Sequence, residues 1–548
     1  GAQEAQDFVN NIQCKINAQE GNSLPVSAFK DYVDGTTPSG TAAYEKRGIA
    51  VNVPVWVPDN CIQCNRCAYV CPHAAIRPVA MTADETANAP EGIKTLPLTG
   101  MKEYTFTMTV SALDCTGCGS CANVCPGKKG NKALEMAPLE ANAGEQKYFD
   151  YGVTLPQKED VIAKYKETTV KGSQFKQPLL EFSGACAGCG ETPYAKLITQ
   201  LFGDRMYIAN ATGCSSIWGN SSPSTPYTTN AKGQGPAWSN SLFEDNAEFG
   251  YGMLLAQRAI RGGLKEKIED LVANGTNEDV KAAGQEWLDT YAVGATNGAA
   301  TEKLVAALEA CGCDKANEIL AQKDFLSKKS QWIFGGDGWA YDIGFGGVDH
   351  VLASGRDINV MVFDTEVYSN TGGQSSKSTP TGAIAQFAAG GKETKKKDMA
   401  SIAMSYGYVY VAQISMGADF NQTVKAIAEA EAYPGPSLII AYAPCINHGI
   451  KKGMSKAQTE EELAVKCGYW HNFRFNPAAE NKFSLDSKTP DMENYMDFLN
   501  GEVRYNSLQR QNPEKAARLF AKNESEAQAR YEYLQKLITL YGADKKED

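Results

Sequence analysis

Two short stretches of the chain hold cysteines at a spacing that suits iron–sulfur chemistry. They read "CIQCNRCAYVCP" at residues 61–72 and "CTGCGSCANVCP" at residues 115–126. In such runs three closely spaced thiolates surround a 4Fe–4S cluster, and the fourth cysteine of each run ligates the other cluster. We therefore assign one cluster to Cys61, Cys64, Cys67 and Cys125, and the second to Cys71, Cys115, Cys118 and Cys121. Zinc is the alternative, although zinc sites rarely use this doubled triplet.

Four further cysteines are more scattered along the chain. Cys186 and Cys189 form a CxxC in "GACAGCGE", while Cys214 and Cys445 each follow a predicted strand. The CxxC alone also fits a redox-active pair or half of a zinc site. Because parallel strands end at one edge of a sheet, where ligands bind, the four cysteines could instead hold a third cluster. The remaining cysteines are interpreted as small buried apolar side chains: Cys14, Cys311, Cys313 and Cys467.

Residues 334–374 have the pattern of one βαβ unit with a glycine-rich turn, "GGDG", after its first strand. Gly335, Gly336 and Gly338 are expected to let backbone amides approach a diphosphate at a helix N-terminus. Asp337, with Thr365 and the Val367 carbonyl at the end of the next strand, can offer hard oxygens to Mg²⁺. This is the thiamine diphosphate pattern. The general motif has Asn where this chain has Thr365, which weakens the magnesium prediction taken alone.

The composition narrows the class of protein. The chain has 548 residues, is 43% hydrophobic and carries a net charge of −11, which argues against nucleic acid or an anionic membrane as a partner. No apolar run approaches the ~20 residues that cross a bilayer. The sixteen cysteines lie mostly in CxxC groups, which favours thiolate ligation in a reducing compartment, the cytoplasm, over disulfides. The start, "GAQEAQDF", is expected to be a cut inside a longer protein or a processed end, with any targeting peptide upstream.

The hydrophobic pattern predicts two folded units. Short apolar runs predict buried, mainly parallel strands of an α/β domain at 206–211, 331–336, 358–364, 408–414 and 437–443. Alternation at 103–110 predicts a strand in the cysteine-rich unit. The expected organisation is a leader over 1–50 that lies against upstream domains, a small α+β ferredoxin-like domain over 51–150, a linker over 151–180, a thiamine diphosphate-binding α/β domain over 181–465 with a helical insertion at 255–330, and a mostly helical extension over 466–548.

Several longer motifs are specific when taken together. They are "YEKRGIA" (44–50), the doubled cluster motif, "FSGACAGCGETPY" (182–194), "ATGCSSIWG" (211–219), "SLFEDNAEFGYGM" (241–253), "GDGWAYDIG" (336–344), "SNTGGQSSKSTPTG" (369–382) and "APCINHG" (443–449). On these motifs nearly the whole chain resembles the C-terminal half of pyruvate:ferredoxin oxidoreductase, a family of oxygen-sensitive 2-oxoacid oxidoreductases.

This resemblance implies roles for individual residues. A Thr occupies the metal position in that family, matching Thr365, and a proximal 4Fe–4S cluster is implied at Cys186, Cys189, Cys214 and Cys445. Glu191 and Cys214 are implied to contact thiamine diphosphate. The other residues implied to line that cofactor are Gly336, Asp337, Gly338, Trp339, Thr365, Glu366, Val367, Tyr368, Ser369 and Asn370.

The implied reaction is the oxidative decarboxylation of pyruvate with coenzyme A to acetyl-CoA and CO₂. Electrons would pass singly through three clusters to ferredoxin or flavodoxin. In the family, the Glu that activates thiamine and the residues for pyruvate and coenzyme A lie upstream, so an N-terminal half on the same or another chain is expected, within a homodimer. The alternatives are the same chemistry on another 2-oxoacid, or a non-catalytic iron–sulfur electron-transfer subunit.

Two charged regions and the histidines are interpreted as structural. "KETKKKD" (392–398) is expected to be a solvated loop, with contact to an acidic ferredoxin as the alternative. The mixed charges of the C-terminal helix are expected to mark a solvated face. His73, His350, His448 and His471 form no nucleophile–base spacing and are expected to be satisfied structural residues.

Overall fold

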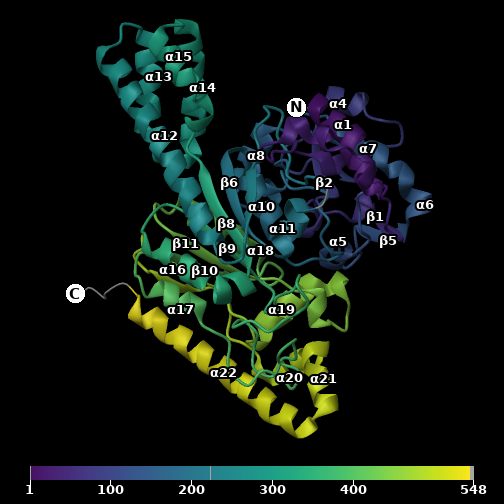
Figure 1. Ribbon diagram of the computed structural model, residues 1–548. Helices are drawn as coiled ribbons and strands as arrows, with labels where there is room; N and C mark the ends of the chain where they lie inside the picture. The colour runs from purple at the N-terminus through teal and green to yellow at the C-terminus, as the bar shows by residue number, and fades with distance from the viewer. Residues whose placement is uncertain (1, 222–223, 543–548) are drawn as a thin grey trace.

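The computed structural model describes residues 2–221 and 224–542, so the last six positions of the predicted C-terminal extension lie outside the described residues. Its largest feature is an eight-stranded sheet in the order β13-β12-β10-β11-β9-β8-β6-β7 (Figure 1). The strands are β6 (Met206–Ala211), β7 (Ala237–Ser241), β8 (Ser330–Gly336), β9 (Asn359–Asp364), β10 (Tyr410–Ile414), β11 (Ser437–Tyr442), β12 (Phe473–Phe475) and β13 (Phe483–Leu485). The six strands from β10 to β7 pair in parallel, which confirms the predicted mainly parallel α/β fold.

The sheet separates two apolar cores because successive side chains of a strand point to opposite faces. In β9, Val360 and Val362 face one core and Met361 and Phe363 face the other. The first core is covered by α12 (Asn246–Asn274), α16 (Phe345–Ala353) and α17 (Met399–Met404), and the second by α10 (Thr192–Phe202) and α18 (Phe420–Ala432). Burial on both faces explains why these strands are continuous apolar runs rather than alternating ones.

The parallel pairing brings four strand ends to the same edge of the sheet. Strands β6, β8, β9 and β11 end at Ala211, Gly336, Asp364 and Tyr442. Each end is followed within three residues by a predicted site residue: Cys214, Asp337, Thr365 and Cys445. The fold therefore gathers at one edge residues that are up to 231 positions apart in the sequence (from 214 to 445).

A helical arm leaves the sheet between β7 and β8 (Figure 1). It consists of the outer part of α12 with α13 (Glu278–Asp289), α14 (Gly294–Cys311) and α15 (Asp314–Leu320). The arm has its own apolar core, which includes Ile268, Trp287 and Leu304. Since α12 begins at Asn246 and packs on β6 and β8, the helical region starts about nine residues before the predicted insertion at 255 and is continuous with the sheet.

The cysteine-rich unit is a small α+β domain beside the sheet (Figure 1). Its strands are β1 (Asn52–Trp56), β2 (Ile76–Met81), β3 (Leu96–Pro97), β4 (Thr105–Val110) and β5 (Leu134–Pro138). Strand β4 pairs with β2 and β3, and β1 pairs with β5, in both cases antiparallel. The helices are α3 (Arg66–Val70), α4 (Ala83–Ala87), α5 (Ser120–Val124), α6 (Leu139–Asn142) and α7 (Gln146–Gly152). Two short helices, α8 (Glu159–Tyr165) and α9 (Val170–Ser173), lie in the predicted linker.

The N-terminal segment packs on both units of this chain. It begins with α1 (Ala2–Phe8) and α2 (Cys14–Asn17), joined by one turn of π-helix. Further along, the Gly40 amide donates to the Tyr227 carbonyl (2.7 Å) and the Gly48 amide to the Leu113 carbonyl (2.8 Å). The leader predicted to lie against upstream domains thus lies, at least in part, against the domains that follow it.

The C-terminal segment packs against the α/β domain, where its last helix contacts the edge strand β13. It contains α19 (Ala457–Cys467), α20 (Tyr495–Asn500), α21 (Val503–Gln511) and the long α22 (Pro513–Leu540). One face of α22 is buried through Leu519 and Leu534, while Arg530 forms an ion pair with Asp398 and Thr381 donates to Glu526 (2.8 Å). The interpretation of the mixed charges as a solvated face is wrong for these residues, because they bind the loop that precedes α17.

Within the described residues, no helix is both long and apolar enough to cross a membrane. All sixteen cysteines lie in the described part of the chain, and none of them forms a disulfide there. Cys14 and Cys313 are exposed and Cys311 is half-buried, so their interpretation as buried apolar side chains is wrong; Cys467 is buried as predicted.

Candidate functional site: three cysteine sets and a diphosphate cradle

The two cysteine runs fold into nearly identical loops. In each, the first thiol accepts a backbone N–H from two residues on: Gln63 to Cys61 (3.3 Å) and Gly117 to Cys115 (3.3 Å). A short helix, α3 or α5, then carries the third cysteine of the run. Backbone N–H groups aimed at sulfur stabilise thiolates and are among the features that set the potential of an iron–sulfur cluster.

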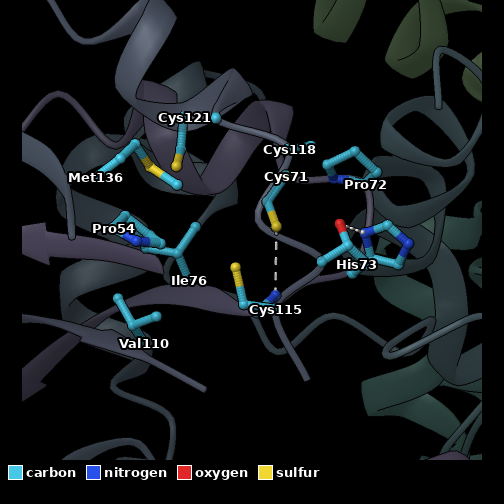
Figure 2. Close-up of a pocket in the computed structure, with 13 residues that line it drawn as sticks. Pro54, Cys71, Pro72, His73, Ile76, Val110, Cys115, Cys118, Cys121 and Met136 are labelled. Carbon is cyan, nitrogen blue, oxygen red and sulfur yellow. Dashed lines mark hydrogen bonds between the residues drawn. The ribbon is translucent and has the colours of Figure 1, made fainter. Parts of the chain in front are cut away.

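The eight cysteines of these runs collect around two cavities, four at each. The cavity of what we call the inner set is lined by Cys71, Cys115, Cys118 and Cys121 (Figure 2). The cavity of the outer set is lined by Cys61, Cys64, Cys67 and Cys125. In Figure 2 the sulfurs of Cys71, Cys115 and Cys121 point into the inner cavity. Each cavity thus takes three cysteines from one run and the last cysteine from the other, which is the grouping that the spacing predicts.

Burial makes these thiols poor acids on their own. It raises the pKa of Cys115 to about 12 and the pKa values of Cys67 and Cys121 well above the usual range. A buried thiol gives up its proton when it ligates a metal centre, because the bond and the positive charge replace lost hydration. No three His, Cys, Asp or Glu side chains in the described chain converge tightly enough to hold a single metal ion. The donor set, four sulfurs around a space with N–H groups directed at them, fits a cluster.

The third set, which we call the proximal set, joins the cysteine-rich unit to the sheet edge. Cys214 begins the short helix α11 (Cys214–Ser216), and the amides of Glu191 and Asn447 donate to the sulfurs of Cys189 (3.4 Å) and Cys445 (3.5 Å). The four thiols are near enough to influence one another's charge, Cys445 with Cys186, and Cys214 with Cys189 and Cys445. The structure therefore brings together the four scattered cysteines.

The proximal and inner sets are adjacent. Burial raises the pKa of the Cys118 thiol, and the nearby backbone N–H of Gly188, between Cys186 and Cys189, partly offsets this rise. His73 spans the same boundary, since one ring nitrogen lies 2.9 Å from the Ala185 carbonyl and the other 3.4 Å from the Thr116 hydroxyl. This is a structural role for His73, as predicted. The outer set lies beyond the inner set and borders an open cavity of about 750 Å³, where Cys64 is part of the lining.

Three oxygens converge at the predicted magnesium position. The Thr365 hydroxyl lies 3.0 Å from the Asp337 carboxylate and 3.0 Å from the Val367 carbonyl. A hydroxyl has one hydrogen, so it cannot donate to both acceptors at once. Mg²⁺ holds six oxygens octahedrally at about 2.0–2.1 Å, which puts neighbouring ligand oxygens about 2.8–3.0 Å apart. The Thr365 hydroxyl therefore lies at the spacing of neighbouring magnesium ligands from both the Asp337 carboxylate and the Val367 carbonyl.

Neighbouring groups hold these oxygens in place. The Ser376 hydroxyl donates to the second carboxylate oxygen of Asp337 (2.6 Å), and the Thr365 amide donates to the first (3.1 Å). The ring of His448 contacts the Thr365 carbonyl at 2.6 Å. Burial and the nearby Asp364 carboxylate raise the pKa of Asp337, so a cation at this position would compensate a charge that the interior disfavours.

The three glycines of the GGDG turn differ in what excludes a side chain at each position. A Cβ on Gly335 would come within 2.3 Å of the Trp339 ring, and a Cβ on Gly338 within 2.4 Å of the Tyr368 ring. A Cβ on Gly336 would meet nothing closer than 3.9 Å. The prediction that all three glycines admit a diphosphate is therefore too broad, because packing against two aromatic rings already requires two of them. The buried indole N–H of Trp339 has no partner among the described residues.

Two other predicted cofactor residues lie beside the proximal cysteines, and a third is exposed. Glu191 is buried beside the proximal cysteines, accepts from the Trp218 indole (2.7 Å), and burial raises its pKa to about 7. The Ser369 hydroxyl lies 3.1 Å from the Cys214 sulfur, and its carbonyl accepts from Asn447 (3.0 Å). Asn370 is exposed.

Glu366 belongs to a buried ion-pair network. Its two carboxylate oxygens bind the guanidinium of Arg504 (2.9 Å) and the ammonium of Lys396 (2.9 Å). Burial alone would raise its pKa, but these two cations together outweigh it and lower the pKa of Glu366 to about 2. The side chain of Glu366 is thus committed to the protein, and only its backbone remains for a ligand.

The basic segment 392–398 is part of the site. Lys392 donates to the carbonyl of Ser376 (2.9 Å), Lys396 pairs with Asp364 (2.8 Å), and Lys397 donates to the carbonyl of Tyr341 (2.8 Å). The interpretation of this segment as a solvated loop is therefore wrong except for residues such as Lys395, which is exposed. Sequence reasoning also missed Asp364, Ser376 and Arg504; Asp364, at the end of an apolar run, had the clearest signal.

Taken together, the fold and the cysteine sets define a ferredoxin-like domain joined to a thiamine diphosphate-binding domain. Family models match accordingly: residues 60–129 match a 4Fe–4S dicluster domain, residues 291–441 match the C-terminal TPP-binding domain of thiamine pyrophosphate enzymes, and residues 2–50 match EKR, a domain of unknown function. The chain thus contains a domain for two 4Fe–4S clusters and a domain for thiamine diphosphate.

Curated relatives are similar over almost the entire chain. A pyruvate-flavodoxin oxidoreductase of Enterobacter agglomerans is 57% identical over 97% of this chain and 46% of its own length. A pyruvate:ferredoxin oxidoreductase of Moorella thermoacetica is 56% identical over 97% of this chain and 46% of its own length. The chain is a homologue of the C-terminal half of these pyruvate oxidoreductases and spans about half the length of the curated relatives that it matches. A solved 2-oxoglutarate:ferredoxin oxidoreductase from Magnetococcus marinus aligns with 48% of this chain and 65% of that chain, at 15% identity and a TM-score of 0.29, too slight a likeness to carry a conclusion.

Proposed function

We propose that this chain is the cofactor-binding and electron-relay half of an enzyme that oxidatively decarboxylates pyruvate with coenzyme A, giving acetyl-CoA and CO₂. The observation that carries the proposal is the continuity of the site. The oxygens of Asp337, Thr365 and Val367, which we call the diphosphate cradle, share a sheet edge with the proximal cysteines, and His73 connects the segment of the proximal set to the loop of the inner set. A path for electrons thus begins at the diphosphate cradle and ends at the outer set.

Each cysteine set has a place in this relay. The proximal set (Cys186, Cys189, Cys214 and Cys445) would hold the first cluster, the inner set the second and the outer set the third. Their N–H groups directed at sulfur favour the anionic, reduced forms of the clusters. Because the outer set borders an open cavity, it is the set from which ferredoxin or flavodoxin would collect single electrons.

The cradle would hold thiamine diphosphate through Mg²⁺ at Asp337, Thr365 and the Val367 carbonyl, with Gly336 giving room to a phosphate. When bound, this cofactor supplies the electron sink that makes decarboxylation of a 2-oxoacid possible. Glu191, whose pKa burial raises to about 7 so that it is only partly ionised at neutral pH, would present a polar edge to the cofactor beside Cys214 without placing a full charge there. The Trp218 indole holds that carboxyl in position (2.7 Å).

The rest of the enzyme is part of the proposal. Because the relatives are about twice as long as this chain, we place the residues for pyruvate, for coenzyme A and for activation of thiamine on an N-terminal half, within a homodimer. A cytoplasmic location follows from thiolate ligands that require reducing conditions.

The test adds pyruvate and coenzyme A, without oxygen, to the purified assembly that contains this chain, and records the visible absorbance of its iron–sulfur clusters. Prompt bleaching is the expected result. The Asp337→Asn variant should lose bleaching by pyruvate and keep bleaching by dithionite, since it removes a carboxylate from the cradle and leaves every cysteine in place. Bleaching by a different 2-oxoacid and not by pyruvate would show that the substrate is that other 2-oxoacid. A complete assembly that responds to dithionite and to no 2-oxoacid would refute the enzyme and leave an electron-transfer subunit.

A further inference from the structure

The N-terminal segment matches a domain of unknown function over residues 2–50, and the structure shows what its last part contacts. We call residues 40–52 the clamp segment. It contains the motif "YEKRGIA" (44–50) and runs from the α/β domain to the loop of the inner cysteine set.

One end of the clamp segment is bound to the α/β domain. The amides of Gly40 and Ala42 donate to the carbonyls of Tyr227 (2.7 Å) and Thr225 (3.2 Å). In return the Thr225 amide donates to the Thr41 hydroxyl (2.7 Å), which is fully buried. Three hydrogen bonds therefore attach this end to a loop that follows Trp218, the partner of Glu191.

The other end of the clamp segment lies under the cysteine loop. The Gly48 amide donates to the Leu113 carbonyl (2.8 Å). A Cβ on Gly117 would come within 2.8 Å of the Asn52 carbonyl and 3.1 Å of the Ala50 methyl group. Because Gly117 lies between two cysteines of the inner set, the clamp segment contacts the chain that shapes the inner cavity.

Lys46, between these two ends, forms an ion pair next to the inner set. Its ammonium lies 2.6 Å from the Asp114 carboxylate and 4.8 Å from the centre of the Phe182 ring, and it donates to the Ala43 carbonyl (2.9 Å). The Asp114 side chain is only 3% exposed and also accepts from Ser111 (2.6 Å). Asp114 immediately precedes Cys115. Lys46 adopts a φ of 44°, in the left-handed region that favours glycine, so its contacts must offset that backbone strain.

Glu45 and Arg47, on either side of Lys46, form a separate pair. Arg47 binds Glu45, whose other oxygen accepts from Asn17 (3.5 Å). Among the three charged residues of the motif, Lys46 is the one whose ion pair reaches the cysteine-rich unit, and it is therefore the one whose charge acts on the inner set.

From this arrangement we propose that Lys46 is a positioning residue that sets the reduction potential of the cluster in the inner set. The inference depends on the proposed function, because it requires a cluster there. A buried carboxylate beside Cys115 opposes the addition of an electron to that cluster. The Lys46 ammonium compensates this charge and, through the clamp segment, fixes the distance of the carboxylate from the sulfur. The role of the motif is thus to hold the inner cluster at a potential at which it accepts electrons from the proximal cluster.

The test is a redox titration of the clusters in the complete, anaerobically purified enzyme, followed by electron paramagnetic resonance. Lys46→Gln should shift the potential of one cluster downward and leave the others unchanged. Asp114→Asn should shift the same cluster upward, and the double variant should return it towards the wild-type value. Lys46→Arg, which keeps the charge, should stay near wild type.

Lys15→Gln is the matched control. It removes a lysine of the same N-terminal segment whose pair with Glu20 (3.2 Å) is exposed on both sides, so no cluster potential should move. If Lys46→Gln fails to retain iron, Asp114→Asn and Lys46→Arg still decide the matter. Unchanged potentials in Asp114→Asn, or shifts in Lys46→Gln that the double variant does not reverse, would overturn the inference. A wild-type enzyme without iron would instead refute the proposed function, so the two failures are distinguishable.

Discussion

The two cysteine loops reach one geometry with different residues. At the two positions where the backbone turns left-handed, the outer loop has Gln63 and Asn65 (φ 57° and 60°) and the inner loop has Gly117 and Gly119 (φ 71° and 79°). Glycine adopts this conformation freely, whereas other residues incur a cost of about 1–2 kcal/mol. The outer loop thus accepts strain that the inner loop avoids.

Their surroundings explain the difference. The Gln63 side chain donates to the Pro97 carbonyl (2.9 Å) and accepts from the Thr99 amide (3.0 Å), and Asn65 donates to the Lys171 carbonyl (3.0 Å). These side chains attach the outer loop to its own domain and to the linker. The inner loop is covered by other segments, so a side chain at Gly117 would meet the clamp segment. The repeated motif therefore differs at the position where one copy is covered by the clamp segment.

The exchange of the fourth cysteine between the loops gives the largest expected effect. Cys71→Ser should remove the inner cluster and Cys125→Ser the outer cluster, since each takes one sulfur from a four-sulfur site. The loss of each cluster is measured by iron content and by the electron paramagnetic resonance spectrum after dithionite reduction. The spectrum of Cys71→Ser should match that of Cys115→Ser, and Cys125→Ser should match Cys61→Ser. A match of Cys71→Ser with Cys61→Ser would contradict the exchange. Cys313→Ser, at an exposed cysteine outside all three sets, is the control.

The second-largest effect is expected when the inner loop receives the outer loop's residue, Gln, at position 117. Gly117→Gln should lower the free energy of unfolding by about 1–3 kcal/mol, the usual cost of overpacking. The reason is that its Cβ would lie 2.8 Å from the Asn52 carbonyl. Loss of iron should accompany the destabilisation and be confined to the inner set. Thermal unfolding and iron analysis check both. Full iron and unchanged stability would show that the clamp segment can move away from the loop.

The reverse exchange should have the smallest effect. Gln63→Gly removes two hydrogen bonds, each contributing about 0.5–1.5 kcal/mol, and also relieves the left-handed strain. A net loss of about 1 kcal/mol with all iron retained is expected in chemical denaturation. Gln63→Ala removes the same bonds without relieving strain, so it should be less stable than Gln63→Gly. If Gln63→Ala is the more stable of the two, strain is not a cost at this position.

The diphosphate cradle shows how far motifs lead. Spacing placed Asp337, Thr365 and Val367 together, and the structure puts the Thr365 hydroxyl 3.0 Å from an oxygen of each of the other two. The spacing of residues in the sequence did not reveal Lys396, which binds Asp364 and Glu366 from a loop that we predicted to be solvated. A lysine-rich stretch has no periodicity that tells an inward side chain from an outward one. Only the partner carboxylates, 30 to 32 positions away, make that distinction.

Some elements of the fold were also invisible in the sequence. Strand β7 (Ala237–Ser241) reads "AWSNS", and β12 and β13 have three residues each, too short for a pattern to emerge. These strands at the two ends of the sheet, of which β7 and β13 are the edges, owe their conformation to the strands beside them. By contrast, β8, β9 and β11 are buried on both faces. Strands of this kind are continuous apolar runs, so the sequence alone identifies them.

The sequence by itself determined how the eight cysteines of the two runs are grouped, where the diphosphate-type turn lies, and which apolar runs form the central strands of the sheet. These features depend on local spacing or on runs of apolar residues, and both are read within a few positions. The tertiary structure alone decided which glycines are required by aromatic rings, which lysines turn inward, and that the N-terminal segment connects the two domains at Lys46. Those outcomes depend on contacts between distant segments, because burial and charge compensation are set by whichever partner the fold brings near.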